Sequence, residues 1–216
     1  MYNYINILKE YDWAKIRRVS DMQGDDYDSI DILIRRIIKS NIQILEIGSS
    51  LGSSCALFAL YAKEYKGKVY SVDKYSSDCL GNPGNYLPNK NAFHTNINNL
   101  GLADFVEQLH MASNEAVKLF EDETFDLIFI DGSHLYLDIK EDLEIWYPKV
   151  KKEGIFCGHD CEKYLKDIKD MNDYVPEKEF MKTDYIKGIH PGVVQAVGEK
   201  FENAKILGHR IWWVKK

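Results

Sequence analysis

Residues 44–54 are the segment that most constrains the fold of this chain. An aliphatic run at residues 44–47 breaks into glycine and serine at residues 48–54, and apolar residues at helical spacing follow. This order predicts a buried strand, a tight turn and the start of a helix. Such a turn brings bare backbone against a ligand, and the free N–H groups of the helix N-terminus point at that ligand. The segment therefore predicts a site for a nucleotide-like cofactor.

Length and composition indicate one globular domain with a sizeable core. The chain has 216 residues, of which 45% are hydrophobic and 29% are charged, as in ordinary globular proteins. The net charge of −6 argues against a nucleic-acid partner, which would normally require a basic surface. No apolar run approaches the roughly 20 residues that span a bilayer, so we expect no membrane partner.

The cysteines and the N-terminus bear on the compartment. Residues 1–10 lack the basic-then-apolar pattern of a secretory signal. The four cysteines form no CxxC pair and no zinc set; they are Cys55, Cys79, Cys157 and Cys161. Free thiols in a reducing compartment are the better interpretation, and we predict a cytoplasmic protein.

Strands and helices are expected to alternate after residue 42. Apolar runs predict seven strands, at residues 42–47, 68–72, 105–111, 125–130, 155–158, 204–208 and 211–215. Helical patterns fit between them at residues 51–65, 89–100, 114–120, 137–146 and 192–201. Such alternation predicts an α/β fold with a Rossmann-like, doubly wound sheet that is mostly parallel and has helices on both faces. A short turn at His209 predicts an antiparallel hairpin of the last two strands.

The first 40 residues differ from the rest. Two helices are expected there, at residues 3–19 and 28–40, separated by an acidic turn at residues 24–26. We therefore divide the chain into an N-terminal helical cap, residues 1–40, and a cofactor-binding domain, residues 41–216. The apolar stripe between Ile30 and Ile38 permits a homo-oligomer. Loops at residues 76–90 and 171–188 are long enough to be functional.

Polar residues at the ends of the predicted strands are the candidates for chemistry, because parallel sheets bind ligands beyond the carboxyl ends of their strands. Asp73 ends the second strand, where an acid can accept both hydroxyls of a ribose. A lone acid at a strand end is more often a helix cap, but the glycine turn before it favours ribose binding. Ser113 ends the third run, where it either contacts the base of a cofactor or caps the next helix.

Two further carboxylates end neighbouring strands. Asp131 follows the strand at residues 125–130, and Asp160 follows Gly158. One or two carboxylates commonly hold Mg²⁺, although each acid alone would more simply cap a helix or loop. His134 lies three residues after Asp131 and can act as a general base near neutral pH, or merely cap the helix that follows. His159 and Asp160 can share a metal only if the strand has already ended, because neighbouring strand residues point to opposite faces.

Together these residues resemble the class I S-adenosylmethionine-dependent methyltransferases. The segment Leu45-Glu46-Ile47-Gly48 followed by Gly52 is similar to the first motif of that superfamily, and Asp73 to its ribose-binding acid. The C-terminal hairpin matches its last two strands. The runs at residues 125–134 and 154–160 resemble the small bacterial metal-dependent O-methyltransferases of the macrolide sugar and cephalosporin-pathway type.

The resemblance implies a set of roles for these residues. It implies S-adenosyl-L-methionine as cofactor, a divalent cation, usually Mg²⁺, at Asp131 and Asp160 with His159 beside them, and His134 as the base. The cofactor would be held by residues of the first motif and of the later strand ends, namely Glu46, Gly48, Ser49, Ser50, Gly52, Ser53, Ser54, Asp73, Ser113 and Asp131. Two residues depart from the family pattern. The family often has an acid or asparagine beside the second carboxylate, where this chain has His159, and glycine in the first-motif turn, where this chain has Ser50.

The implied reaction is methylation of a hydroxyl group on a sugar or glycosylated small molecule. Asp131 and the metal would stabilise the developing alkoxide while His134 accepts its proton. An NAD-dependent oxidoreductase is the main alternative, disfavoured because residues 48–52 lack the GxGxxG spacing. A non-catalytic cofactor-binding module with the same fold is the second alternative.

Overall fold

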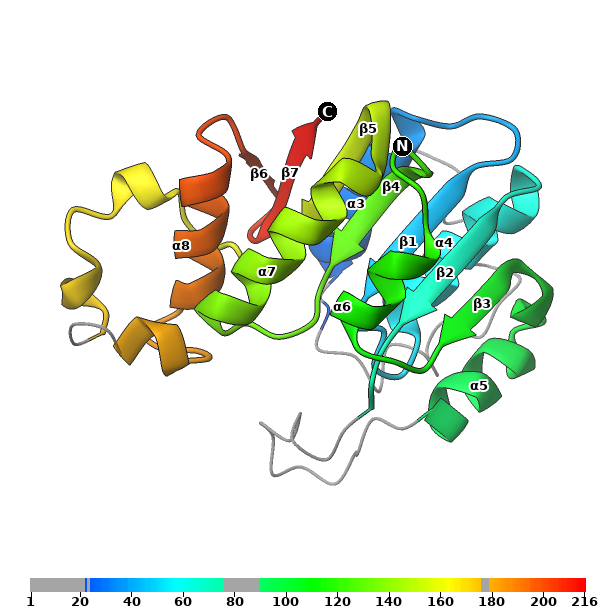
Figure 1. Ribbon diagram of the computed structural model, residues 1–216, viewed down its shortest axis with the longest axis horizontal. Coiled ribbons are helices and arrows are strands. Elements are labelled where there is room, and N and C mark those ends of the chain that lie inside the picture. The colour runs from blue at the N-terminus through cyan, green and yellow to red at the C-terminus, as the bar shows by residue number, and fades with distance from the viewer. Residues whose placement is uncertain (1–21, 23, 76–89, 176–178) are drawn as a thin grey trace.

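The protein folds around a single sheet of seven strands (Figure 1). The structure, a computed structural model, describes residues 22, 24–75, 90–175 and 179–216. The described residues do not include the helix predicted at residues 3–19, Cys79 or most of the loop predicted at residues 76–90. Among the described residues, no helix is both long enough and apolar enough to cross a membrane.

The strand order confirms the predicted fold class. The strands are β1 (Gln43–Ile47), β2 (Lys68–Val72), β3 (Val106–Leu109), β4 (Phe125–Ile130), β5 (Val150–Gly158), β6 (Lys205–Leu207) and β7 (Ile211–Lys215). They lie in the order β3-β2-β1-β4-β5-β7-β6. The first five strands are parallel, and β7 runs antiparallel between β5 and β6. Because the order reverses between β1 and β4, the ends of these two strands are the expected ligand site.

The fifth strand begins five residues earlier than predicted. Val150 pairs with Phe125, and the backbone of Glu153 and Gly154 exchanges hydrogen bonds with Lys216. The side chains of the intervening residues 151–153 are partly or fully exposed. Charged residues at this end of the strand therefore hid its start from a search for apolar runs.

The helices agree with the predictions except at the N-terminus and after β3. They are α3 (Gly24–Arg35), α4 (Ser53–Glu64), α5 (Lys90–Asn99), α6 (Ser113–Ala116), α7 (Tyr136–Trp146) and α8 (Pro191–Lys200). The predicted acidic turn at residues 24–26 is wrong, because these residues form the first turn of α3. Acids are favourable there because they face the positive end of the helix dipole. The helix predicted at residues 114–120 divides into α6 and a 3₁₀ turn, Val117–Leu119.

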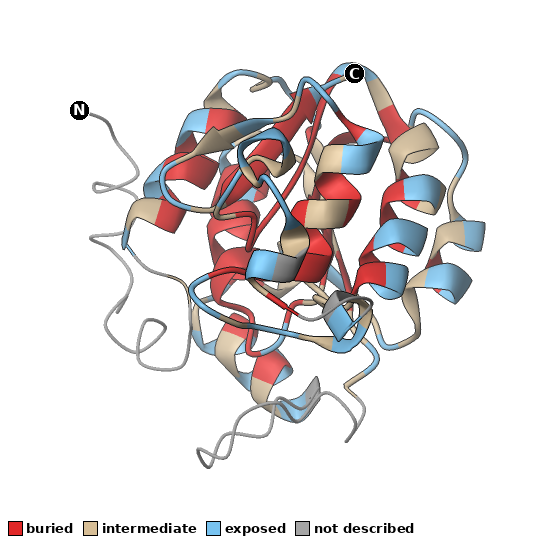
Figure 2. Cartoon of the chain, turned by 90° about the vertical axis from the view of Figure 1, so that its left-hand side faces the viewer, coloured by how far each residue is buried: buried red, intermediate tan, exposed pale blue. Residues whose placement is uncertain are grey.

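Two apolar cores lie on opposite faces of the sheet, and Figure 2 shows the buried strands between the outer helices. Successive strand residues alternate between them, as the pleat requires: Leu127 and Phe129 enter the core beneath α3 and α4, whereas Ile128 and Ile130 enter the one beneath α7 and α8. In the same way, Trp213 enters the core beneath α3 and α4, and Trp212 enters the one beneath α7 and α8. The predicted helices on both faces are therefore confirmed.

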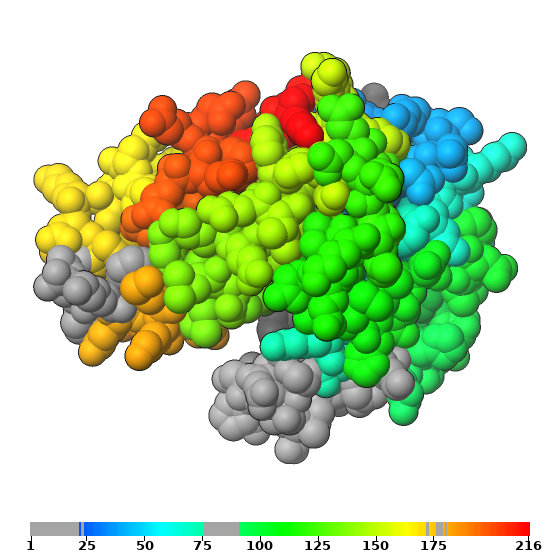
Figure 3. All heavy atoms as spheres, viewed as in Figure 1, coloured from blue at the N-terminus to red at the C-terminus, as the bar shows by residue number. Residues whose placement is uncertain are grey.

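Helix α3 is part of the first core. Ile30, Leu33 and Ile34 are buried, and Ile37 and Ile38 pack against the same cluster. Most of the apolar stripe on which the predicted homo-oligomer rests is thus covered within the chain. Oligomerisation stays a prediction. The division into an N-terminal cap and a cofactor-binding domain also stays a prediction. Helices α7 and α8 pack side by side on the other face (Figure 3).

Candidate active site

The turn after β1 is built around the backbone of β4. Gly48 has φ of +85°, and a Cβ added there would lie 2.0 Å from the backbone oxygen of Asp131. The N–H of Gly48 donates to Val72 O at 2.9 Å, and the N–H of Asp131 donates to Ile47 O at 2.8 Å. Only glycine fits such an approach. The first-motif turn is therefore joined directly to the strand end that bears Asp131.

The predicted ribose acid holds the same turn from the other side. Asp73 Oδ2 accepts the N–H of Ser50 at 2.9 Å, and Oδ1 accepts the N–H of Tyr75 at 2.8 Å. Ser50 has φ of +47° and Gly52 has φ of +89°, a left-handed region that glycine adopts readily and serine does not. The hydrogen bond to Asp73 offsets part of the cost of serine at this position. Both carboxylate oxygens keep lone pairs for a further donor.

Beneath the turn lies a buried polar network. Glu46 is fully buried; its Oε1 accepts the hydroxyl of Ser54, and its Oε2 has no hydrogen-bond partner among the described residues. Ser71 Oγ donates to Ser49 Oγ at 2.6 Å. Burial raises the pKa of Glu46 to about 8. An unpartnered buried oxygen beside a glycine turn is where a cationic donor of a ligand would be stabilised most.

The next residues of the motif are also hydrogen-bonded. Ser53, at the start of α4, shares a hydrogen bond with the hydroxyl of Tyr27 from α3. Ser113 begins α6; its hydroxyl donates to Asp142 and accepts the indole N–H of Trp146 at 2.7 Å. The side chain of Ser113 thus joins α6 to α7 and does not cap its own helix, for which Ala112 is the cap residue.

Four predicted residues converge at the ends of β4 and β5. Because β5 ends at Gly158 and Asp160 has φ of +60°, His159 and Asp160 both turn toward Asp131. His159 Nδ1 lies 3.0 Å from Asp160 Oδ1 and 3.5 Å from Asp131 Oδ1. His134 Nε2 lies 3.1 Å from Asp160 Oδ2 and 4.0 Å from Asp131 Oδ1. The sequence analysis allowed a shared site only if the strand ends before His159, and β5 does end at Gly158.

Burial and hydrogen bonds shift the pKa values of the residues in this cluster. Burial alone would lower the pKa of His134, but hydrogen bonds to Asp160 and Asp184 outweigh it and raise the pKa to about 10. Burial would likewise raise the pKa of Asp160, but hydrogen bonds from His134 and His159 hold it well below its usual range. Burial raises the pKa of Asp131. Without a cation, His134 is therefore protonated near neutral pH and donates a hydrogen bond to Asp160.

A second layer of side chains surrounds the cluster, and the sequence analysis did not predict it. Asp26 Oδ2 lies 3.1 Å from His159 Nε2 and 2.9 Å from Arg210 Nη2. Asp184 Oδ1 lies 2.8 Å from His134 Nδ1. His190 has its Nδ1 2.7 Å from Glu162 Oε1 and 3.5 Å from Asp160 Oδ1. These partners come from distant segments and have no local sequence signal.

Three sets of described side chains come close enough to share one cation. They are Asp131, His134 and Asp160; Asp160, Glu162 and His190; and His134, Asp184 and His190. His159 is in none of these sets, although its Nδ1 faces both Asp131 and Asp160. The site thus offers both oxygen and imidazole nitrogen donors.

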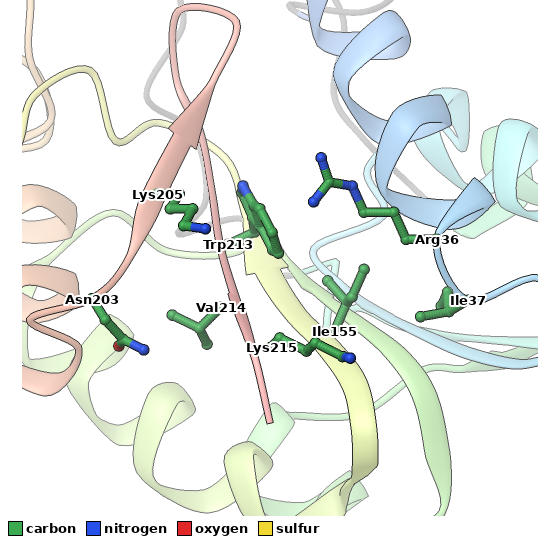
Figure 4. Close-up of a pocket in the computed structure, with 8 residues that line it drawn as sticks. All are labelled: Arg36, Ile37, Ile155, Asn203, Lys205, Trp213, Val214 and Lys215. Atoms are coloured by element: carbon green, nitrogen blue, oxygen red, sulfur yellow. The ribbon is translucent and has the colours of Figure 1, made fainter.

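Two cavities lie away from this cluster. One, of about 300 Å³, lies beside β7 near the end of α3, where Trp213 lies between Arg36 and Lys205 (Figure 4). These cations are 4.6 and 5.2 Å from the centroid of the Trp213 ring. The other, of about 430 Å³, runs along α8 and includes Cys161 and Trp212. None of the predicted site residues lines either cavity.

Comparison with known proteins agrees with this geometry. The family of methyltransferase domains matches residues 45–161, which run from the first-motif turn to just beyond Asp160. The chain belongs to this family. With the seven-stranded sheet and its antiparallel β7, the match identifies a class I S-adenosylmethionine-dependent methyltransferase domain and counts against the dehydrogenase alternative.

A curated relative is 30% identical over 123 residues, an uncharacterized protein, y4gI, of Sinorhizobium fredii (strain NBRC 101917 / NGR234). The match covers 56% of this chain and 13% of the relative, so the chain spans only a small part of that protein's length.

Solved structures share the fold. A Staphylococcus aureus protein described as a caffeoyl-CoA O-methyltransferase is 19% identical, with a TM-score of 0.66, and the alignment covers 100% of this chain and 93% of that one. A Bacillus cereus O-methyltransferase in complex with SAH is 16% identical, with a TM-score of 0.60 and coverage of 100% and 92%. A SAM-dependent methyltransferase of Aquifex aeolicus is 18% identical, with a TM-score of 0.52 and coverage of 95% and 97%.

Proposed function

We propose that the protein transfers a methyl group from S-adenosylmethionine to a hydroxyl oxygen of a sugar or glycosylated small molecule, assisted by a divalent cation and by His134 as base. The supporting observation is the position of Asp131. Its backbone abuts the Gly48 turn, and its side chain faces His159 and lies 4.0 Å from His134. A cofactor at the turn and an acceptor at the histidine cluster would therefore meet at one residue.

The residues of the turn fit the proposed cofactor. Gly48 leaves room where a Cβ would clash with β4, and Glu46 Oε2 is an unpartnered buried oxygen suited to the ammonium of the methionine moiety. Asp73 keeps lone pairs for the ribose hydroxyls beyond the two backbone donors it accepts. Placing the methyl donor and the acceptor in line would supply much of the rate acceleration.

The cation would be held by Asp131 and Asp160, which belong to one set of side chains close enough to share an ion, with His159 beside them. When bound, the cation would stabilise the alkoxide that develops as the hydroxyl loses its proton. Asp160 accepts from both His134 and His159, so positive charge between the two carboxylates would compete with the imidazolium of His134. The neutral His134 could then accept a proton at Nε2, while Asp184 holds the proton at Nδ1.

The choice of a sugar acceptor rests on the resemblance to the small bacterial O-methyltransferases. The test is formation of S-adenosylhomocysteine with a panel of glycosides and of simple phenols, with and without a chelator. His134→Ala and Asp131→Asn should each reduce turnover at least 100-fold, whereas His209→Ala, whose side chain is 84% exposed, should not. Undiminished transfer by both variants would refute the mechanism, and cofactor binding without transfer to any acceptor would favour the non-catalytic module.

A further inference from the structure

Residues 184–190 form a tight β-hairpin beside the histidine cluster. Ile186 and Ile189 pair across it, because the N–H of each donates to the carbonyl oxygen of the other, at 3.0 and 3.1 Å. The two residues between them, Lys187 and Gly188, have φ of +49° and +84°, as a type I′ turn requires. Ile189 is fully buried and anchors the hairpin to the body of the protein.

Two neighbouring residues of this hairpin contact two histidines of the site. Asp184 Oδ1 lies 2.8 Å from His134 Nδ1, and the ring of Tyr185 packs on His190 with the ring centroids 4.8 Å apart. The rings of His190 and His134 are in turn 4.6 Å apart in an edge-to-face arrangement. One imidazole ring therefore separates Tyr185 from the proposed base.

Tyr185 offers an aromatic surface to solvent at this place. Its side chain is 59% exposed, and among the residues whose exposure the structure describes it is the only exposed aromatic. The support beneath it is firm, because Glu162 accepts the backbone N–H of His190 at 3.0 Å and lies 2.7 Å from its Nδ1. A tyrosine has only two side-chain torsions and loses little conformational freedom on binding. The exposed part of the ring is thus a preformed binding surface next to the site.

The position of this surface indicates which part of the acceptor it binds. Aromatic faces carry partial negative charge and attract the C–H edges of other rings. We propose that Tyr185 binds a second ring of the acceptor, joined to the sugar whose hydroxyl is methylated, so that glycosides of cyclic groups are better acceptors than free monosaccharides. This inference rests on the proposed function and deepens it, since a hydroxyl at His134 leaves the neighbouring ring one imidazole further along the site.

The same separation predicts the kinetic effect of Tyr185. Because an imidazole lies between Tyr185 and the reacting oxygen, its contact with the acceptor is equally strong in the ground state and the transition state. Such a contact lowers KM and leaves kcat unchanged. Tyr185 is therefore a specificity-determining residue and takes no part in the proton transfer.

Binding without turnover tests this inference. Protein loaded with S-adenosylhomocysteine is titrated with methyl, cyclohexyl and phenyl glycosides of the same sugars by saturation-transfer difference NMR. We expect the cyclohexyl or the phenyl glycoside to bind about three- to ten-fold more tightly than the methyl glycoside, and the comparison of the two shows whether a saturated or an aromatic ring is preferred. Tyr185→Ala should remove this gain, whereas Tyr185→Phe, which keeps the ring, should retain it.

Leu119→Ala is the matched control, since Leu119 is also 59% exposed but lies in the 3₁₀ turn after α6; it should leave the gain unchanged. An unchanged affinity for S-adenosylhomocysteine shows that each variant is folded. If a ring brings the wild type no gain, or if Tyr185→Ala keeps that gain, the inference is wrong. Methyl transfer is measured separately. The ring gain without any transfer would contradict only the proposed function, whereas transfer with a KM that Tyr185→Ala does not raise would contradict only this inference.

Discussion

Gly48 and Asp131 meet backbone to backbone, because a Cβ on Gly48 would lie 2.0 Å from the carbonyl oxygen of Asp131. This contact fixes the distance between the cofactor turn and the first carboxylate of the acid–histidine cluster. Two sites that are 83 residues apart in sequence numbering are therefore one rigid unit at the switch point of the sheet.

Gly48→Ala should strongly destabilise the protein, because the methyl group overlaps backbone atoms that cannot move without separating β1 from β4. The φ of +85° adds strain, and we expect a loss of about 3 kcal/mol or more in the free energy of unfolding. Urea unfolding measures it. Gly101→Ala is the matched control, since φ is +65° there and nothing lies within 4 Å of the added Cβ; it should cost only about 1–2 kcal/mol.

Glu46→Gln should change stability with opposite signs at low and high pH. Burial raises the pKa of Glu46 from 4.5 to about 8, so the stability that the protonated acid provides below pH 4.5 is lost as pH rises to about 8. This loss corresponds to up to about 5 kcal/mol. Glutamine avoids it but leaves an unpaired buried N–H₂ that costs about 1–3 kcal/mol.

The glutamine variant is therefore expected to be less stable than the wild type at pH 5 and more stable at pH 9. Urea unfolding at pH 5, 7 and 9 without cofactor measures the difference. The exposed Glu64→Gln in α4 should show no such crossover. A constant difference between Glu46→Gln and wild type across this range would mean that the Glu46 carboxyl is ionised throughout.

The sequence was sufficient to predict the sheet and the proximity of Asp131 and Asp160, because both depend on local signals. Asp131 and Asp160 end apolar runs, and neighbouring parallel strands bring their ends together. The partners of the histidines could not be found in this way. Asp26 contacts His159 only after α3 packs on the sheet, and the acids in its first turn are typical of both turns and helix starts. The start of β5 was hidden because residues 151–153 are charged.

Asp184→Asn should lower the rate of methyl transfer without unfolding the protein. Asp184 is 2.8 Å from His134 Nδ1 and its side chain is 60% exposed, so its removal leaves no buried charge unpaired. Without this acceptor the orientation and tautomer of His134 are less defined, and we expect kcat to fall about 10–100-fold. S-adenosylhomocysteine formation is the assay, and Asp173→Asn, exposed in the same region, is the control.

A histidine NMR titration of the same variant, free of added metal, adds a reading independent of turnover. Because the hydrogen bond to Asp184 contributes to the raised pKa of His134, that pKa should fall in Asp184→Asn. If kcat and the titration of His134 are both unchanged, Asp184 has no influence on the imidazole.

Ser50→Gly should stabilise the protein while leaving the cofactor turn intact. Ser50 has φ of +47°, a conformation that costs a residue with a Cβ roughly 1–2 kcal/mol, and glycine loses about 0.5–1 kcal/mol of that gain through its greater freedom when unfolded. The net expectation is a gain of about 0.5–1 kcal/mol in unfolding free energy, read from urea curves. The N–H that donates to Asp73 is a backbone group, so Ser50→Gly keeps it. The affinity for S-adenosylhomocysteine should therefore change less than two-fold, and a marked loss would show instead that the Ser50 hydroxyl contacts the cofactor.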